Sequence, residues 1–133
     1  MLGMKRLRLP EFIEVLVPTR DRNGGALSAA KQREWKGRLA RYLLETLKVT
    51  GFQESKREGV WKQEQKDLRE YDPKTDRLYL VREKVYVMRT NCTRAQVNAF
   101  RRDGEALLAA MGKALNQEAV AYETREGLTI LIL

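Results

Sequence analysis

The spacing of apolar and polar residues predicts a short strand near the start of the chain and a long helix after it. Residues 11–17 alternate, which places Ile13, Val15 and Val17 on one face of a strand. Pro18 ends this strand, because proline offers no N–H to a neighbouring strand. Apolar residues then recur at helical spacing over 28–47, and the serine that opens this segment is a suitable N-cap. The helical stripe consists of Trp35, Leu39, Tyr42, Leu43 and Leu47.

The second half of the chain predicts a hairpin, a second helix and two further strands. The turn sequence "YDPKTD" separates residues 60–71 from residues 78–88, and we expect these two segments to pair. Thr93 and Gln96 have the spacing of a capping box, so a helix begins there. Its apolar face consists of Val97, Phe100, Leu108, Met111 and Leu115. "EAVAYE" and "LTILIL" then read as two strands joined by the turn "TREG".

This order of elements predicts an α+β fold. Strand, helix, strand, strand, helix and strand make a ferredoxin-like βαββαβ sandwich, here with an additional C-terminal strand. We expect residues 1–10 to be a basic N-terminal tail and residues 11–133 to be a single domain. The order of elements resembles that of small CRISPR-associated nucleases, a resemblance of topology alone. In that family an acidic residue stands near the end of the first strand.

The last strand predicts self-association. Its residues are apolar on both faces, with Leu131 and Leu133 on one face and Leu128 and Ile130 on the other. Such a strand invites aggregation at a solvated edge. One face can pack on the helices, and we expect a second copy to cover the other in a homodimer or higher homo-oligomer. The expected interface residues are Tyr79, Tyr86, Leu131 and Leu133. The alternative is that a loop from the middle of the same chain covers this face.

Composition limits the chemistry that the chain can perform. It has one cysteine, Cys92, and no histidine, which excludes an intrachain disulfide and histidine-based catalysis. We therefore interpret Cys92 as structural and expect no metal, no catalytic residue and no cofactor. The sequence has no apolar run long enough to span a membrane and no secretory signal, so we expect a cytoplasmic protein without a membrane partner.

The positive charge is concentrated in the first third of the chain. The formal net charge is +8, and residues 1–48 hold 11 Lys/Arg against 5 Asp/Glu. This asymmetry points to an anionic partner, with nucleic acid first, while solvation of the surface is the plain alternative. The expected phosphate contacts are Arg20, Arg22, Arg33, Arg38 and Arg41.

The loop "VPTRDRNGGALS" carries the remaining candidate chemistry. A glycine loop before a helix can present N–H groups to a phosphate, but "NGG" is equally the sequence of a plain turn. Asp21 in this loop and Glu83 in the predicted hairpin are candidate carboxylates for a metal ion, and capping of its own turn is the simpler role for Asp21.

Three functions follow from these observations. The first is a small oligomeric binding module, not an enzyme, which contacts nucleic acid through its basic face. The second is a metal-dependent nuclease that uses Asp21 and Glu83. The third is a protein-binding assembly or regulatory subunit whose charge only solvates it.

Overall fold

The computed structural model describes residues 3–64 and 78–133, and the side chains of residues 3–58 and 84–133. Its elements, in chain order, are β1 (Glu11–Val17), α1 (Ala29–Arg41), η1 (Tyr42–Thr46), β2 (Gln53–Glu64), β3 (Leu78–Cys92), α2 (Arg94–Ala99), η3 (Phe100–Gly104), α3 (Glu105–Ala114), β4 (Ala119–Thr124) and β5 (Gly127–Ile132). The two η elements are single π-helical turns: η1 ends the first long helix, and η3 lies between α2 and α3 in the second. The predicted α+β class and the ferredoxin-like order with an extra strand are confirmed.

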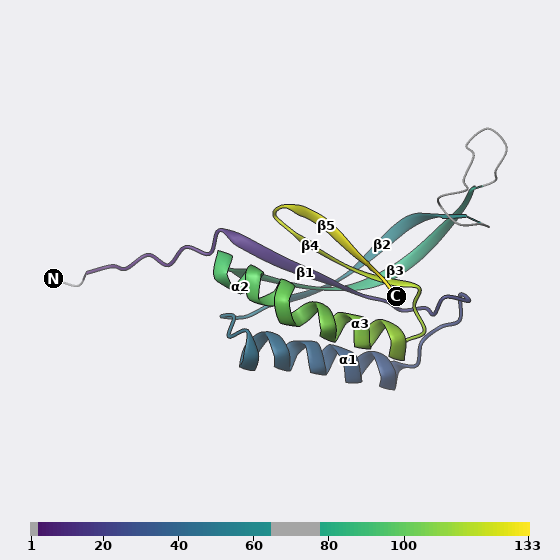
Figure 1. Ribbon diagram of the computed structural model, residues 1–133, viewed down its shortest axis with the longest axis horizontal. Helices are drawn as coiled ribbons and strands as arrows, with labels where there is room; N and C mark the ends of the chain where they lie inside the picture. Colours follow the sequence, from purple (N-terminus) through teal and green to yellow (C-terminus); the bar gives the residue numbers. More distant parts are fainter. Residues whose placement is uncertain (1–2, 65–77) are drawn as a thin grey trace.

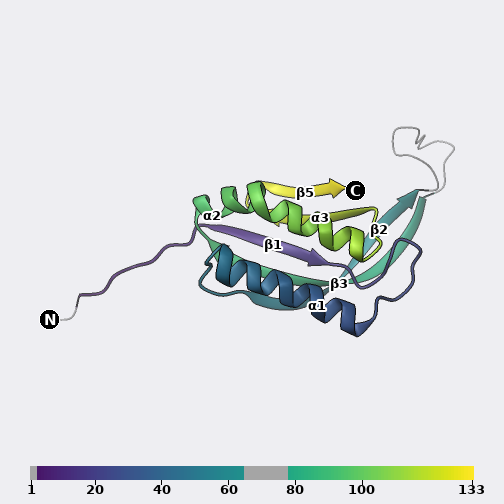
Figure 2. The same cartoon turned by 60° about the horizontal axis from the view of Figure 1, so that its bottom comes forward.

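The five strands form one antiparallel sheet in the order β2-β3-β1-β4-β5. Both long helices cover the same face of this sheet, as Figures 1 and 2 show. Beyond the end of β1, the β2–β3 arm continues away from the rest of the sheet (Figure 1). The turn "YDPKTD" lies outside the described residues. In the described part of the chain, no helix is both long and apolar enough to cross a membrane.

The core lies between the helices and the central strands. The predicted stripes are confirmed, since Ile13, Val15 and Val17 are fully buried, together with Leu39 of α1 and Leu108 of α3. Both predicted N-caps are also confirmed. The Ser28 side chain accepts a hydrogen bond from the backbone of Lys31, and Thr93 forms a capping box with Gln96.

The side of β5 that remains open is the opposite of the one expected. The register pairs Leu131 with Val120, whose side chain packs under the helices, so Leu131 also faces the helices and packs against the core. The Leu133 side chain lies over Gly112 of α3. The open face of the sheet instead carries Leu128, Ile130 and Ile132, which are 49%, 57% and 85% exposed.

Tyr86 also lies on the helix-facing side, because it pairs with the buried Val17 of β1. The side chain of Tyr79, the fourth expected interface residue, lies outside the described residues. A second copy that covers the open face stays a prediction.

A buried carboxylate on the open face ties three strands together. Glu14 in β1 is 2% exposed. Arg57 in β2 donates from Nη1 and Nη2 to its two oxygens at 2.9 and 2.7 Å, and Nη1 of Arg89 in β3 lies 3.5 Å from Oε1. Burial alone raises the pKa of Glu14, but the hydrogen bonds and charges of Arg57 and Arg89 outweigh burial and hold this pKa below its usual value.

The end of the first helix has a residue with positive φ. Lys48 has φ 58°, a left-handed conformation that glycine adopts at lower cost. We expect Lys48→Gly to raise the free energy of unfolding by about 0.5–1 kcal/mol, measured by urea denaturation. The matched control is Asn116→Gly, since Asn116 has φ 52° and asparagine tolerates this region well. If Lys48→Gly raises the free energy of unfolding no more than Asn116→Gly does, relief of backbone strain at Lys48 does not explain the gain.

Candidate functional site

The loop after β1 is held together by its own side chains. Asp21 Oδ1 accepts hydrogen bonds from the backbone N–H groups of Asn23 and Gly25, each at 2.9 Å. Gly24 has φ 83°, so glycine is needed for the turn. Thr19 Oγ1 donates to the backbone carbonyl of Lys84, which fixes the start of the loop to β3. Asp21 thus caps its turn, the simpler of the two roles considered for it.

Two of the five arginines expected to contact phosphate also support this loop. Arg20 Nη1 donates to the carbonyl of Gly24 at 2.9 Å, and Arg22 Nη2 donates to the carbonyl of Gln117 at 3.0 Å. One guanidinium group thus closes the loop on itself, and the other joins the loop to the segment before β4.

The other three arginines are exposed on α1, and the structure places them away from the loop's hydrogen bonds. Arg38 pairs with Glu34 at 2.8 Å, one helical turn away, and lies over the ring of Trp35. Arg33 and Arg41 are exposed to solvent.

Of the two candidate carboxylates, only that of Asp21 lies among the described side chains, together with the thiol of Cys92. Within the described residues, no three acidic or cysteine side chains gather closely enough to hold a metal ion. The side chain of Glu83 lies outside the described residues. Cys92 is fully buried, and burial followed by the charge of Glu11 raises the pKa of its thiol to about 11. Cys92 therefore stays a protonated thiol, in agreement with the structural role expected for it.

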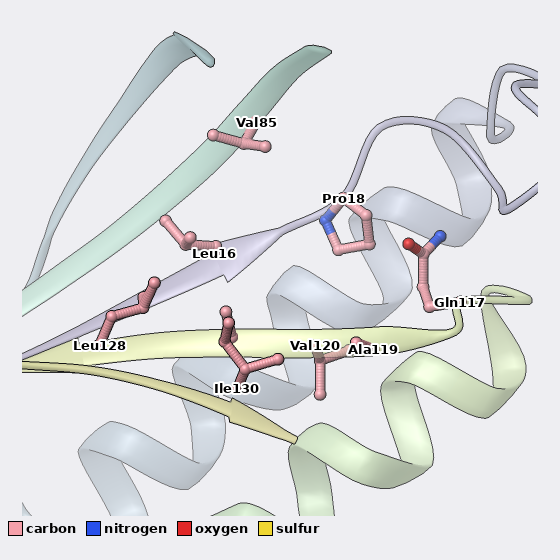
Figure 3. Close-up of a pocket in the computed structure, with 9 residues that line it drawn as sticks. Leu16, Pro18, Val85, Gln117, Ala119, Val120, Leu128 and Ile130 are labelled. Atoms are coloured by element: carbon pink, nitrogen blue, oxygen red, sulfur yellow. The ribbon is translucent and has the colours of Figure 1, made fainter. Parts of the chain in front are cut away.

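Two hollows flank the end of β1. The first, which we call the apolar hollow, has a volume of about 260 Å³ and lies on the open face of the sheet. Figure 3 shows the side chains around it, which come from β1, β3, β4 and β5, from the loop after β1 and from the segment before β4. The lining side chains include Leu16, Pro18, Val85, Leu128 and Ile130, with the amide of Gln117 at one end.

Gln117 is the polar group of the apolar hollow, and its position is fixed. Its Nε2 donates to the carbonyl of Arg20 at 2.6 Å and to that of Leu115 at 3.0 Å. Both amide hydrogens are therefore used, and the amide oxygen remains the part of this side chain suited to accept a hydrogen bond from a bound molecule.

The second hollow, which we call the cationic hollow, has a volume of about 460 Å³. It lies between the loop after β1, α1 and the β2–β3 arm, and Val85 lines it as well as the apolar hollow. The two hollows lie on opposite faces of the sheet, because Tyr86 of the cationic hollow shares the helix-facing side with Val17, whereas Leu16 of the apolar hollow is on the open face. The ionisable side chains that line the cationic hollow are Arg20, Lys36, Lys56, Lys84, Glu58 and Tyr86.

Tyr86 is fixed in the wall of the cationic hollow by two charged side chains. Its hydroxyl donates to Glu54 Oε2 at 2.6 Å, and Lys36 Nζ lies 3.8 Å from the centre of its ring. The hydrogen bond to Glu54, followed by burial and the charge of Glu54, raises the pKa of Tyr86. Its hydroxyl therefore stays protonated at neutral pH and acts as a donor.

Sequence reasoning missed the lysines of β2 and β3. The charge count drew attention to residues 1–48, whereas Lys56 and Lys84 lie in the hairpin. A signal was present, because Glu54, Lys56 and Glu58 alternate along the chain and so share one face of a strand. Three charged residues on one face of a strand indicate that this face lines a charged surface.

Among known proteins, the structure of this chain is similar to that of an enzyme. No family model matches the chain, and no curated protein matches it. Two solved structures do, both of a phage SAM lyase, one in complex with S-methyl-5′-thioadenosine and one in the apo state. Their TM-scores are 0.60 and 0.59, at 12% identity, over 99% of this chain and 97% of the other. At this identity the likeness shows the fold.

These neighbours contradict the predicted function. The sequence led us to expect a non-enzymatic module that binds nucleic acid, with a metal-dependent nuclease or a protein-binding subunit as alternatives. The structures that share the whole fold are those of a lyase. Part of the physical reason for the error is that Arg20, Arg22 and Asp21, which suggested phosphate or metal binding, are hydrogen-bonded to backbone groups of the loop and of Gln117.

Proposed function

We propose that this chain is a lyase that cleaves S-adenosylmethionine (SAM) and releases S-methyl-5′-thioadenosine. The observation that carries this proposal is the match to the phage SAM lyase over nearly the full length of both chains. Because one fold can host many activities, the proposal also needs a site of suitable chemistry in this chain. The apolar hollow at the end of β1 is the candidate for this site.

The apolar hollow suits the uncharged part of the substrate. Small-molecule sites are mostly apolar, with a few polar groups that fix orientation, and span roughly 300–1,000 Å³. The apolar hollow has aliphatic walls and one fixed amide, Gln117, and its volume of about 260 Å³ lies just below this range. Adenine can lie between Leu16 and Ile130, with its amino group directed at the Gln117 oxygen.

The chemistry of the reaction fits a chain without histidine. The sulfonium of SAM is a good leaving group, and the bond that breaks joins sulfur to the four-carbon amino-acid chain. The electron pair of this bond goes to sulfur, which becomes the neutral thioether of S-methyl-5′-thioadenosine. A lyase adds no water, so the four-carbon fragment either closes through its own carboxylate or loses a proton. The first route requires no general base, and the chain has no histidine to supply one.

The test is a direct assay of the purified chain with SAM. We expect S-methyl-5′-thioadenosine to form well above a protein-free control, as measured by liquid chromatography with mass detection of the nucleoside and of the four-carbon product. The mass of the second product also reports whether water entered. No release above the control would show that the chain is not a SAM lyase.

A variant that fills the apolar hollow tests its role. Ala121 faces this hollow from β4, and we expect Ala121→Trp to lower kcat/KM for SAM at least about tenfold by occupying the nucleoside's space. Ala106→Trp is the matched control, because Ala106 is exposed on α3. Equal kcat/KM values for the two variants, at equal unfolding midpoints, would contradict the assignment of the hollow.

A further inference from the structure

We propose that Glu123 binds the ammonium group of the substrate's amino-acid tail, at the end of the apolar hollow opposite to Gln117. This inference rests on the proposed lyase function and adds the part of the same site that recognises charge. It keeps the whole substrate on the open face of the sheet, with the adenosine in the apolar hollow and the tail beside Glu123.

Glu123 directly borders the apolar hollow on the open face. In the register of the sheet it pairs with Leu128, which lines the hollow, and it stands two residues after Ala121, which also lines it. Residues opposite each other on one face of an antiparallel pair have Cβ atoms about 4.5–5.5 Å apart, and residues i and i+2 of a strand share a face. The Glu123 side chain therefore lies next to the hollow, on the same face of the sheet.

Gln117 and Glu123 stand at opposite ends of the hollow. Figure 3 shows Gln117 at one end of the lining side chains and Leu128, the partner of Glu123, at the other. Along β4, the four steps from Ala119 to Glu123 correspond to about 13 Å of strand. SAM is a linear molecule, with the adenine amino group at one end, the sulfonium in the middle and the amino acid at the other end. An adenine directed at Gln117 therefore places the ammonium, rather than the sulfonium, near Glu123.

The other charged groups beside Glu123 on this face already have partners. Glu14 lies directly opposite Glu123 across β1 and β4. Arg57 gives both terminal nitrogens to Glu14, at 2.9 and 2.7 Å. Arg89 lies 3.5 Å from Glu14 and 4.0 Å from the centre of the Phe12 ring. Both arginines are thus engaged by groups other than Glu123.

Glu123 is left without a close counter-charge. In the part of the chain that the structure describes, no lysine or arginine lies within ion-pair distance of its carboxylate, and its charge acts on Arg57 only from farther away. Two carboxylates directly opposite each other repel, so the neighbouring Glu14 adds to the cost of an uncompensated Glu123. An ammonium group at this end of the hollow would remove the cost on binding, and hydrogen bonds between two charged groups are among the strong ones.

Two thioethers separate the tail from the nucleoside. S-adenosylhomocysteine and S-methyl-5′-thioadenosine share the adenosine, and only the first carries the amino acid. By isothermal titration calorimetry, we expect Glu123→Gln to bind S-adenosylhomocysteine about 10- to 100-fold more weakly than the wild type does. Binding of S-methyl-5′-thioadenosine should be unchanged, which also shows that the variant is folded and that its hollow is intact.

A third compound tests whether the ammonium is the group recognised. In the desamino analogue of S-adenosylhomocysteine, hydrogen replaces the amino group and the carboxylate remains. The wild type should bind this analogue at least about tenfold more weakly than S-adenosylhomocysteine, whereas Glu123→Gln should bind the two compounds nearly equally. Equal binding of the two compounds by the wild type would overturn the assignment of the ammonium.

The control is Glu45→Gln, which makes the same change in net charge at an exposed glutamate of η1, outside both hollows. This variant should bind all three compounds as the wild type does. If Glu123→Gln binds S-adenosylhomocysteine normally, or weakens S-adenosylhomocysteine and S-methyl-5′-thioadenosine equally, the role of Glu123 is overturned while the lyase proposal stands. If the wild type binds neither of these two compounds, the proposed function fails and this inference fails with it.

Discussion

Replacing the buried carboxylate of Glu14 with an amide, Glu14→Gln, should destabilise the fold by about 2 kcal/mol at pH 7. Removing one partner of a buried ion pair costs about 3–5 kcal/mol when the remaining charge stays buried. Here the side chains of Arg57 and Arg89 are 51% and 39% exposed, so both can turn partly to water and the expected cost falls below this range. Urea denaturation of the variant and the wild type measures this difference.

The same variant predicts a specific dependence on pH. The pKa of Glu14 is held below its usual value in the folded state, so ionised Glu14 stabilises the fold at pH values above the unfolded pKa. This contribution is lost as the pH falls through the folded pKa, because protonated Glu14 then resembles glutamine. The stability difference between the wild type and Glu14→Gln should therefore be full at pH 7 and shrink below about pH 4.

Glu34→Gln is the matched control for Glu14→Gln. Glu34 forms an exposed pair with Arg38 one helical turn away, and such pairs contribute about 0.3–0.5 kcal/mol. If Glu14→Gln costs no more than Glu34→Gln, or if its cost is the same at pH 3 and pH 7, then Glu14 does not hold the three strands together electrostatically.

Much of the fold could be predicted because local signals agreed with one another. The alternation of Ile13, Val15 and Val17, the Ser28 cap and the Thr93–Gln96 box each fix a short segment, and the structure confirms all of them. The open side of β5 could not be predicted in the same way. Its strand is apolar on both faces, so the sequence pattern carries no preference, and only pairing with β4 turns Leu131 toward the helices.

The candidate site was missed because it belongs to no single segment. Its two hollows are lined by residues from α1 and from all five strands, which meet only after the sheet has formed. Arg20 and Arg22 of the first loop were expected to contact phosphate, whereas in the structure they donate hydrogen bonds to the carbonyls of Gly24 and Gln117. A charge in a sequence does not reveal whether a backbone carbonyl of its own loop will use it.

Gly104 in the second helix predicts the other large loss of stability. A Cβ at this position would lie 2.5 Å from Cδ2 and 2.8 Å from Cε2 of Phe100. The Phe100 ring is 1% exposed and is flanked by the rings of Tyr122 and Tyr42, at 4.9 and 6.1 Å between centres. It cannot move aside without disturbing both neighbours, so the contact falls in the range of about 1–3 kcal/mol for an overpacked core, near the upper end.

Gly104→Ala should therefore lower the free energy of unfolding by about 2 kcal/mol, even after the gain of about 1 kcal/mol that alanine gives over glycine within a helix. Gly37→Ala measures that gain separately, because Gly37 lies in α1 with no atom within 4 Å of its added Cβ. We expect Gly37→Ala to stabilise the chain by about 1 kcal/mol, so that the two alanine variants differ by about 3 kcal/mol in thermal or urea unfolding. Two alanine variants of similar stability would show that the Phe100 ring has room to move, and that close contact with this ring is not what requires glycine at position 104.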